Sequence, residues 1–295
     1  MLFSDITFGV YQGDKIGIIA ANGSGKTTFL NIIAGSEDYD SGNIMAKNDL
    51  RIGYLPQLPE FNPDLTPVEY LQEGAPLDGE DFSVYDAGIK FLTQFNITDL
   101  SKKMGEMSGG QVKRVALAKV LADSPDLLIL DEPTNHLDIE IVEWLENYLS
   151  KSNVTLLMVT HDRYFLDNVC NKIIEIDRKG FYFYEGNYDY YLEKREERYE
   201  ALNAELLKVK NLLRTELDWM RRQPQARGSK AKYRIDNFYR LEEKSKVNLN
   251  SRELTLGKGG GYIGNKIFEA KIFLNLLSIK RFLRISTIYF QKMKN

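Results

Sequence analysis

Residues 20–27 read Ala-Ala-Asn-Gly-Ser-Gly-Lys-Thr, and this stretch decides the fold of the chain. A short apolar run, residues 16–20, precedes the glycines, and residues 29–34 after them read as a helix that ends at Gly35. A strand, a glycine-rich loop closed by Lys-Thr, and a helix in this order are the context of a phosphate-binding loop. An ordinary glycine-rich turn would explain residues 23–25 but not the elements around them. The stretch therefore predicts an α/β fold.

The residues of this loop suit a nucleoside triphosphate with its magnesium ion. Glycines at 23 and 25 allow backbone N–H groups to point at a phosphate, where a Cβ would obstruct the approach. We expect Lys26 to reach the β- and γ-phosphates and the Thr27 hydroxyl to bind Mg²⁺. Ala20 stands where such loops usually have their first glycine, and we expect it to be tolerated if its φ is negative. The predicted nucleotide-binding residues are Asn22, Gly23, Ser24, Gly25, Lys26, Thr27 and Thr28.

Two carboxylates follow a second apolar strand. Residues 126–130 have the continuous apolar pattern of a buried parallel strand, and Asp131-Glu132 come directly after them. In open α/β sheets, ligands bind at the carboxyl ends of the strands. We expect Asp131 to complete the Mg²⁺ shell and Glu132 to orient and deprotonate the attacking water. A carboxylate pair at a strand end is often only solvated charge, but residues 133–138, Pro-Thr-Asn-His-Leu-Asp, follow without a break.

His161 ends another predicted strand, residues 155–160. A single histidine after a strand is usually structural. Here it precedes Asp162-Arg163 and follows the other motifs in order, so we favour a contact with the γ-phosphate.

Composition sets limits on function. The chain has 295 residues, 39 Lys and Arg against 42 Asp and Glu, and a formal net charge of −3, so its overall charge does not indicate a nucleic-acid binder. The single cysteine, Cys170, favours a reducing cytoplasm over a disulfide-bonded scaffold. No signal peptide and no apolar run near the length of a membrane span is apparent, so a transporter role would need a separate membrane chain.

The motifs in this order resemble the ATP-binding cassette superfamily, over residues 1 to about 190. The resemblance implies a P-loop cassette with a mixed sheet, a helical subdomain between Gln57 and Ser108, ATP and Mg²⁺ as cofactors, and hydrolysis to ADP and phosphate. Residues 107–111, Met-Ser-Gly-Gly-Gln, match its signature motif, normally Leu-Ser-Gly-Gly-Gln. There Ser108, Gly109 and Gly110 bind the γ-phosphate held by an opposite cassette, and Gln57 senses Mg²⁺ and the lytic water. Ser108 is also predicted to cap a helix, whose N-terminus attracts anions.

A charged segment follows the cassette. Residues 193–218 read as a polar helix with an apolar stripe, Pro224 and Gly228 should break it, and residues 231–246 should return. The result is an α-helical hairpin on the order of 45–50 Å long. Residues 219–235 contain six basic residues and no acidic one. Charge alone leaves a nucleic-acid surface and a solvated turn equally open.

Residues 219–227 and 230–238 resemble the inter-cassette linker of ABC-F proteins, closest to the Uup branch. Residues 135–138 and 161–167 also match ABC-F motifs. In that family two cassettes lie in one chain, and the linker contacts tRNA and the ribosome near the peptidyl-transferase centre. Uup relatives are also associated with branched DNA, so DNA stays open as a target. The resemblance implies nucleic-acid contacts by Arg221, Arg222, Arg227, Lys230, Lys232 and Arg234.

Both ends of the sequence depart from the family pattern. A cassette normally opens with a strand whose aromatic residue stacks on adenine; none precedes Leu2, so we expect N-terminal truncation and weakened base stacking. Residues 264–271 resemble the approach to a second cassette, but Ile-Phe-Leu-Asn-Leu-Leu then replaces the expected sequence. Deleting one A from codons for Lys-Asn-Ile-Ser-Lys-Ser-Phe produces this replacement. We therefore expect a frameshift after Lys271, and rank a basic amphipathic membrane helix well below it.

We thus expect three parts: a cassette at 1–190, a basic-tipped hairpin at 191–250, and a stub of a second cassette at 251–295. The expected function is a cytoplasmic, ribosome-associated ABC-F ATPase in partial copy. It would hydrolyse ATP slowly unless a second cassette or a homodimer completes the site. The alternatives are the ATP-binding subunit of a transporter, a DNA-structure-binding ATPase, and a decayed gene product.

Overall fold

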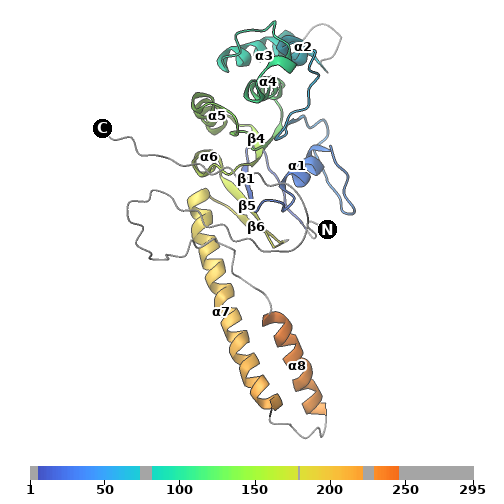
Figure 1. The fold of residues 1–295 in the computed structure, drawn as a ribbon, viewed down its shortest axis with the longest axis vertical. Helices are drawn as coiled ribbons and strands as arrows, with labels where there is room; N and C mark the ends of the chain where they lie inside the picture. Colours follow the sequence, from blue (N-terminus) through green and yellow to red (C-terminus); the bar gives the residue numbers. More distant parts are fainter. Residues whose placement is uncertain (1–5, 74–81, 179, 222–228, 246–295) are drawn as a thin grey trace, which may run out of the picture. The chain divides into compact units, whose positions relative to one another are not determined.

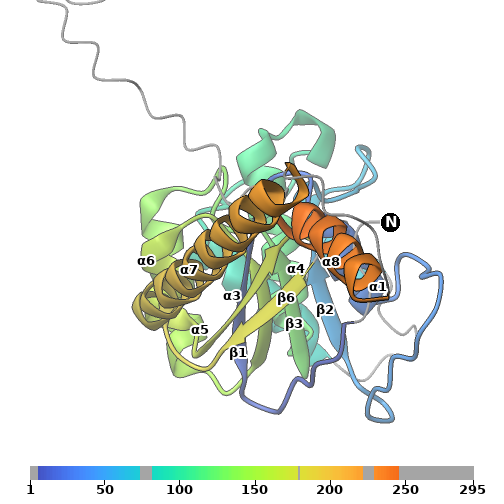
Figure 2. The ribbon, with the colours of Figure 1, turned by 90° about the horizontal axis from the view of Figure 1, so that it is seen from below.

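The central sheet of the protein has six strands. The computed structural model describes residues 6–73, 82–178, 180–221 and 229–245. The sheet order is β2-β3-β4-β1-β5-β6, and its strands lie side by side in Figure 2. Five strands are parallel, and β6 runs antiparallel to β5, so the expected mixed α/β sheet is confirmed. The strands are β1 (Lys15–Ala20), β2 (Ile52–Leu55), β3 (Leu127–Asp131), β4 (Thr155–Val159), β5 (Lys172–Asp177) and β6 (Gly180–Tyr184).

Alternate residues of the strands pack into two hydrophobic layers. Leu127 and Ile129 of β3 belong to the layer that contains Phe29 and Leu30 of helix α1 (Lys26–Ala34). Leu128 and Leu130 point to the opposite face, because successive side chains of a strand alternate. The helices that contribute to this second layer include α4 (Gly109–Ala122), α5 (Ile139–Lys151) and α6 (Arg163–Val169) (Figure 1).

The segment between Gln57 and Ser108 is helical, as expected. It contains α2 (Pro67–Gln72), α3 (Phe82–Gln94) and a 3₁₀ turn, η1 (Met104–Glu106). Phe95, directly after α3, packs against α5: its ring centroid lies 5.0 Å from that of Trp144. The helical segment is thereby packed against the same layer as the signature helix α4.

Two long helices form the hairpin. Helix α7 (Tyr188–Arg221) has 34 residues, and α8 (Ser229–Ser245) has 17. At 1.5 Å per residue α7 is about 51 Å long. The predicted break around Pro224 lies outside the described residues, but α7 ends and α8 begins on either side of it. The expected boundary after residue 190 falls inside α7, which begins at Tyr188.

The first turns of α7 are attached to the sheet by a polar cluster, which we call the α7 anchor. Its centre is Glu175 of β5, only 3% exposed. The Arg195 and Arg198 side chains form ion pairs with this carboxylate at 2.9 and 2.8 Å. The hydroxyl groups of Tyr184 and Tyr191 donate to the same carboxylate. The anchor is completed by contacts of Arg198 and Tyr199 with Asp177.

A second polar contact joins α7 and α8 near the end of α7. The Arg234 guanidinium of α8 donates to Glu216 of α7 at 2.5 Å and lies 4.3 Å above the Trp219 ring. One arginine therefore joins the two helices by an ion pair and a cation–π contact.

In the described part of the chain, none of the helices combines the length and apolar character that a membrane span needs. The predicted second-cassette stub and frameshift, residues 251–295, lie outside that part.

Candidate nucleotide-binding site

The phosphate loop has the predicted backbone. It connects β1 to α1, and Gly23 and Gly25 have φ values of 76° and 93°, which favour glycine. Ala20 is the last residue of β1, and among the described non-glycine residues it is not one with positive φ. The condition under which we expect alanine to be tolerated at this position is therefore met. Thr28 lies in the first turn of α1.

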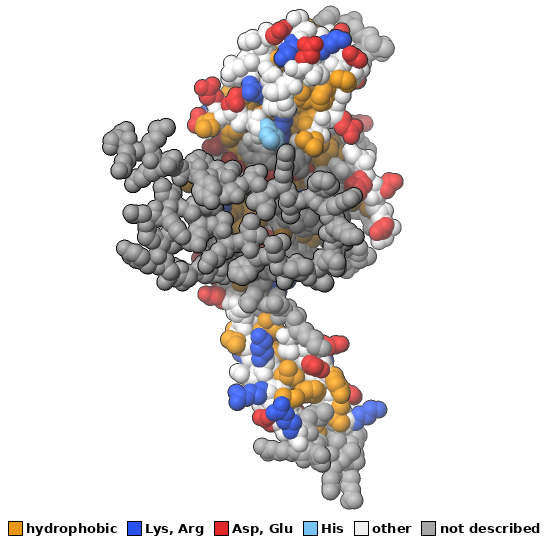
Figure 3. All heavy atoms as spheres, in the orientation of Figure 1, with side chains coloured by type: hydrophobic (Ala, Val, Ile, Leu, Met, Phe, Trp, Pro, Cys, Tyr) orange, Lys and Arg blue, Asp and Glu red, His pale blue; other side chains and the backbone are white. Residues whose placement is uncertain are grey.

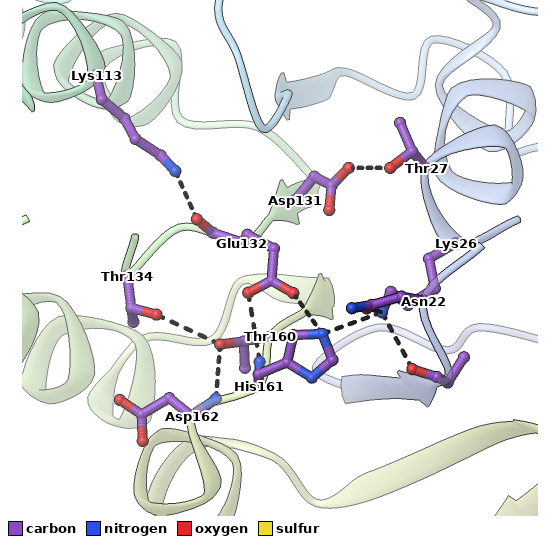
Figure 4. Close-up of polar contacts among 11 residues, drawn as sticks. Asn22, Lys26, Thr27, Lys113, Asp131, Glu132, Thr134, Thr160, His161 and Asp162 are labelled. Atoms are coloured by element: carbon purple, nitrogen blue, oxygen red, sulfur yellow. Dashed lines mark hydrogen bonds and ion pairs between the residues drawn. The ribbon is translucent and has the colours of Figure 1, made fainter. Parts of the chain in front are cut away.

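Lys26 points across the loop toward a neighbouring strand end (Figure 4). Its Nζ donates to the Ala20 carbonyl at 3.1 Å and to the Asn22 amide oxygen at 3.4 Å. The same nitrogen lies 3.2 Å from Nε2 of His161, 135 residues further along the chain. The Ser24 hydroxyl is buried and has no hydrogen-bond partner within the described residues. A loop with an ammonium group and an unused buried hydroxyl suits a phosphate.

Thr27 and Asp131 meet at the expected magnesium position. The Thr27 hydroxyl donates to the Asp131 carboxylate at 2.7 Å, and Asp131 is 1% exposed. In the described chain, this is the only hydrogen bond or ion pair to the Asp131 side chain. A buried carboxylate without a cation is costly, and carboxylate and hydroxyl oxygens are the ligands that Mg²⁺ takes. The residues present therefore fit a magnesium ion.

Glu132 is buried beside this pair, with an unusual backbone. Its φ is 48°, in the left-handed region, and its N–H donates to the Val159 carbonyl of β4 at 2.8 Å. The carboxylate accepts from the backbone N–H of His161 at 3.3 Å. Burial raises the pKa of Glu132 above its usual range, while His161 and Lys26 act in the opposite direction. A carboxylate with a raised pKa next to a phosphate loop suits a general base.

His161 stands between Lys26 and Glu132. Its Nε2 lies 3.2 Å from the lysine Nζ and 3.4 Å from a Glu132 oxygen. A neutral Nε2 either accepts from the lysine or donates to the carboxylate, so its tautomer decides which contact is a hydrogen bond. In either tautomer, the imidazole lies between the start of α1 and the end of β3.

The two remaining motifs occupy different places. Gln57 is exposed, two residues beyond β2, and Leu55 pairs with Leu130, so Gln57 lies at the sheet edge that carries Asp131. Ser108 is the N-cap of α4, as predicted, and its hydroxyl accepts from the Gln111 N–H at 3.3 Å. In the described contacts, nothing joins Ser108, Gly109 or Gly110 to the side chains around Lys26.

One residue of the site was missed at the level of sequence. Lys113 of α4 is 2% exposed, and its Nζ donates to the backbone carbonyl of Glu132 at 2.5 Å. The signal was available: Lys113 is a charged residue inside the apolar helix pattern that begins at Ser108.

The predicted nucleic-acid residues are only partly described. Arg221 and Lys232 are exposed on the hairpin, whereas Arg234 holds Glu216 and Trp219. Lys230 belongs to α8, and Arg222 and Arg227 lie outside the described residues. Lys and Arg side chains lie beside hydrophobic ones on the hairpin in Figure 3.

Comparison with known proteins matches two segments to family models. Residues 3–135 match a model described as ABC transporter, and residues 174–255 match a second model with the same description. The ATP-binding subunit of an ABC transporter, a solved structure, has a TM-score of 0.54 and 24% identity, over 59% of this chain and 79% of that one. That likeness supports the fold.

Curated relatives cover almost the whole chain. The ABC transporter ATP-binding protein YfmR of Bacillus subtilis is 37% identical over 306 residues, which is 92% of this chain and 48% of the relative. The energy-dependent translational throttle protein EttA of Escherichia coli K12 is 33% identical, over 91% of this chain and 55% of the relative. The chain therefore spans about half the length of these relatives. With the mixed sheet and the clustered motifs, the matches show that the chain belongs to the ABC transporter ATP-binding cassette family.

Proposed function

We propose that the chain is an ATP-binding and ATP-hydrolysing cassette of the ABC-F class, which acts in the cytoplasm on the translating ribosome. The observation that carries the ATPase part is the meeting of Lys26, Thr27, Asp131, Glu132 and His161 at one sheet edge. These residues come from three separate segments of the sequence, 26–27, 131–132 and 161. An accidental cluster would not combine a phosphate loop, a fitting magnesium position and a buried base.

In the proposed reaction, the chain holds the triphosphate and positions water. Backbone N–H groups around Gly23 and Gly25 and the Lys26 ammonium bind the phosphates. Thr27, Asp131 and Gln57 would hold Mg²⁺, which when bound supplies positive charge beside the transferred phosphoryl group. Glu132 accepts the proton of the attacking water, and His161 contacts the γ-phosphate.

The site is proposed to need a second cassette, from a partner chain or from a homodimer. Ser108 caps α4 at a place with no described contact to Lys26 or Glu132. Its hydroxyl and the first N–H groups of a 14-residue helix form an anion-binding end that suits a phosphate presented by another molecule. A lone cassette would therefore bind ATP and turn it over slowly.

The proposed link to translation rests on the hairpin and on one relative. EttA is named a translational throttle protein, and the hairpin offers exposed Arg221 and Lys232 to a phosphate backbone. The Uup-like assignment rests only on the linker motif around residues 219–238. Transfer RNA, ribosomal RNA and branched DNA share the phosphate chemistry, so the experiment must separate them.

Co-sedimentation tests this role. The Glu132→Gln chain, loaded with ATP, should pellet with ribosomes at near-physiological salt, and Arg221→Glu with Lys232→Glu should reduce the pelleted fraction. Binding to branched DNA but not to ribosomes, or recovery with membranes, would overturn the translation role and leave the ATPase proposal intact.

A further inference from the structure

Lys113 is a buried cation whose position is not explained by packing. It is 2% exposed, and burial lowers the pKa of its ammonium group. Among the described residues it forms no ion pair, although burying a charge without a partner is costly. Its Nζ instead donates to one backbone oxygen, the carbonyl of Glu132, at 2.5 Å (Figure 4).

The same face of α4 holds the loop after β3 at two further points. A Cβ on Gly110 would lie 2.6 Å from the His136 carbonyl oxygen, so only glycine allows this approach. The Arg114 guanidinium donates to Asp138 at 2.8 Å. Residues 110, 113 and 114 are spaced as neighbours on one helical face. Helix α4 is therefore docked on residues 132–138 through a patch rather than a single contact.

The Glu132 peptide needs support because of its conformation. A φ of 48° is uncommon for a non-glycine residue, and such conformations persist where the surroundings hold them. The carbonyl of Glu132 accepts from the Asn135 N–H at 3.3 Å and from Lys113. Both acceptor directions of this carbonyl are thus used. Rotation of the peptide would break these bonds and turn the carboxylate away from His161.

We propose that Lys113 is a positioning residue for ATP hydrolysis: it fixes the Glu132 peptide so that the carboxylate faces the attacking water. This inference rests on the proposed ATPase function and deepens it. Since α4 begins at Ser108, the inference has a second consequence. If a bound phosphate displaced the Ser108 end of α4, Lys113 would move with the helix and shift the Glu132 peptide of the same cassette.

A matched pair of substitutions on α4 tests the proposal. Lys113→Met keeps the length and apolar stem of the side chain but removes the donor. Lys119→Met is the control, because Lys119 lies on the same helix, half-buried, over the Tyr70 ring and away from Glu132. We expect Lys113→Met to lower kcat by about 10- to 100-fold, as misplacement of a catalytic group does, with ATP affinity and thermal midpoint unchanged. Lys119→Met should keep the wild-type kcat.

A double-mutant cycle separates positioning from general damage. In a Glu132→Gln background, Lys113→Met should cause no further loss of residual turnover, because both changes disable the same group. An equal loss in both backgrounds would overturn the proposal. If Lys113→Met fails to fold, Lys113→Gln replaces it, because its amide is too short to reach the carbonyl. Its turnover is then compared in the wild-type and Glu132→Gln backgrounds in the same way.

The wild-type rate separates the positioning role of Lys113 from the proposed ATPase function. Wild-type turnover that Lys113→Met leaves unchanged would remove the positioning role alone. A wild-type chain with no turnover, at any concentration, would remove the proposed function and this inference with it.

Discussion

At the scale of single residues, Glu132 is the most informative side chain. Burial favours its neutral form, while Lys26 and His161 favour the ionised form, and the balance leaves its pKa above the ordinary 4.5. A general base must be ionised to accept a proton. Burial thus makes Glu132 a stronger base, while Lys26 and His161 favour its ionised form.

The pH profile of kcat/KM follows from this balance. Because the pKa of Glu132 is raised, its protonation as pH falls begins at a higher pH than for an exposed glutamate. We therefore expect the acid limb of kcat/KM, which reports the free enzyme, to lie above pH 4.5. The limb should be measured within the range where circular dichroism shows the chain folded. A rate that stays constant down to pH 4.5 contradicts the assigned role.

Sequence patterns predict the local part of this site well. Lys26 and Thr27 follow a glycine loop, Ser108 precedes the helix that it caps, and Asp131 ends an apolar strand, so each is fixed by its neighbours in the chain. Lys113 was missed because its partner is a backbone oxygen 19 residues away, a contact that only the packing of α4 on the loop after β3 creates. The left-handed φ of Glu132 could not be predicted from the sequence, because glutamate has no preference for that conformation.

At the scale of elements, the start of α7 differs most from expectation. The composition changes after residues 186–188 and the hairpin is expected from residue 191, whereas the helix begins at Tyr188 and its first turns are attached to the sheet. The polar residues of those turns are not a solvated face. Arg195 and Arg198 pair with the buried Glu175 of β5.

The α7 anchor should dominate the stability of this junction. Glu175→Gln keeps the shape but leaves the two arginines without their carboxylate. We expect the unfolding free energy to fall by about 2–3 kcal/mol. This is less than for a fully buried ion pair, because the Arg195 side chain is 40% exposed. Glu197→Gln is the control, since among the described residues Glu197 pairs only with Lys194, one turn away on the helix surface. Equal chemical denaturation midpoints for the two variants would contradict the anchor.

At the scale of the whole molecule, two parts of the proposed ATPase site are not in contact within the described residues. The phosphate loop, Asp131, Glu132 and His161 form one cluster, and none of the described contacts joins Ser108 to it. A second copy related by symmetry would present each Ser108 to the other phosphate loop. The chain spans about half the length of its curated relatives. Whether a second copy of this chain supplies the opposite cassette is tested by measuring turnover in solution.

Turnover per chain should therefore rise with protein concentration if homodimers form. Mixing Ser108→Ala with Lys26→Ala chains should restore activity above either alone, because the mixed dimer holds one intact site. Fast turnover that is independent of concentration, with no rescue on mixing, would show that one cassette suffices.

The central claim is that the phosphate loop and the end of β3 bind one magnesium-bound triphosphate. Isothermal titration calorimetry of ATP with and without Mg²⁺ tests it most directly, using wild type, Asp131→Asn, and Asp126→Asn at the other end of the same strand as control. We predict one ATP site whose affinity rises by about tenfold or more with Mg²⁺, a gain that is lost in Asp131→Asn and kept in Asp126→Asn. No heat with wild type, or an unchanged magnesium effect in Asp131→Asn, would contradict the account.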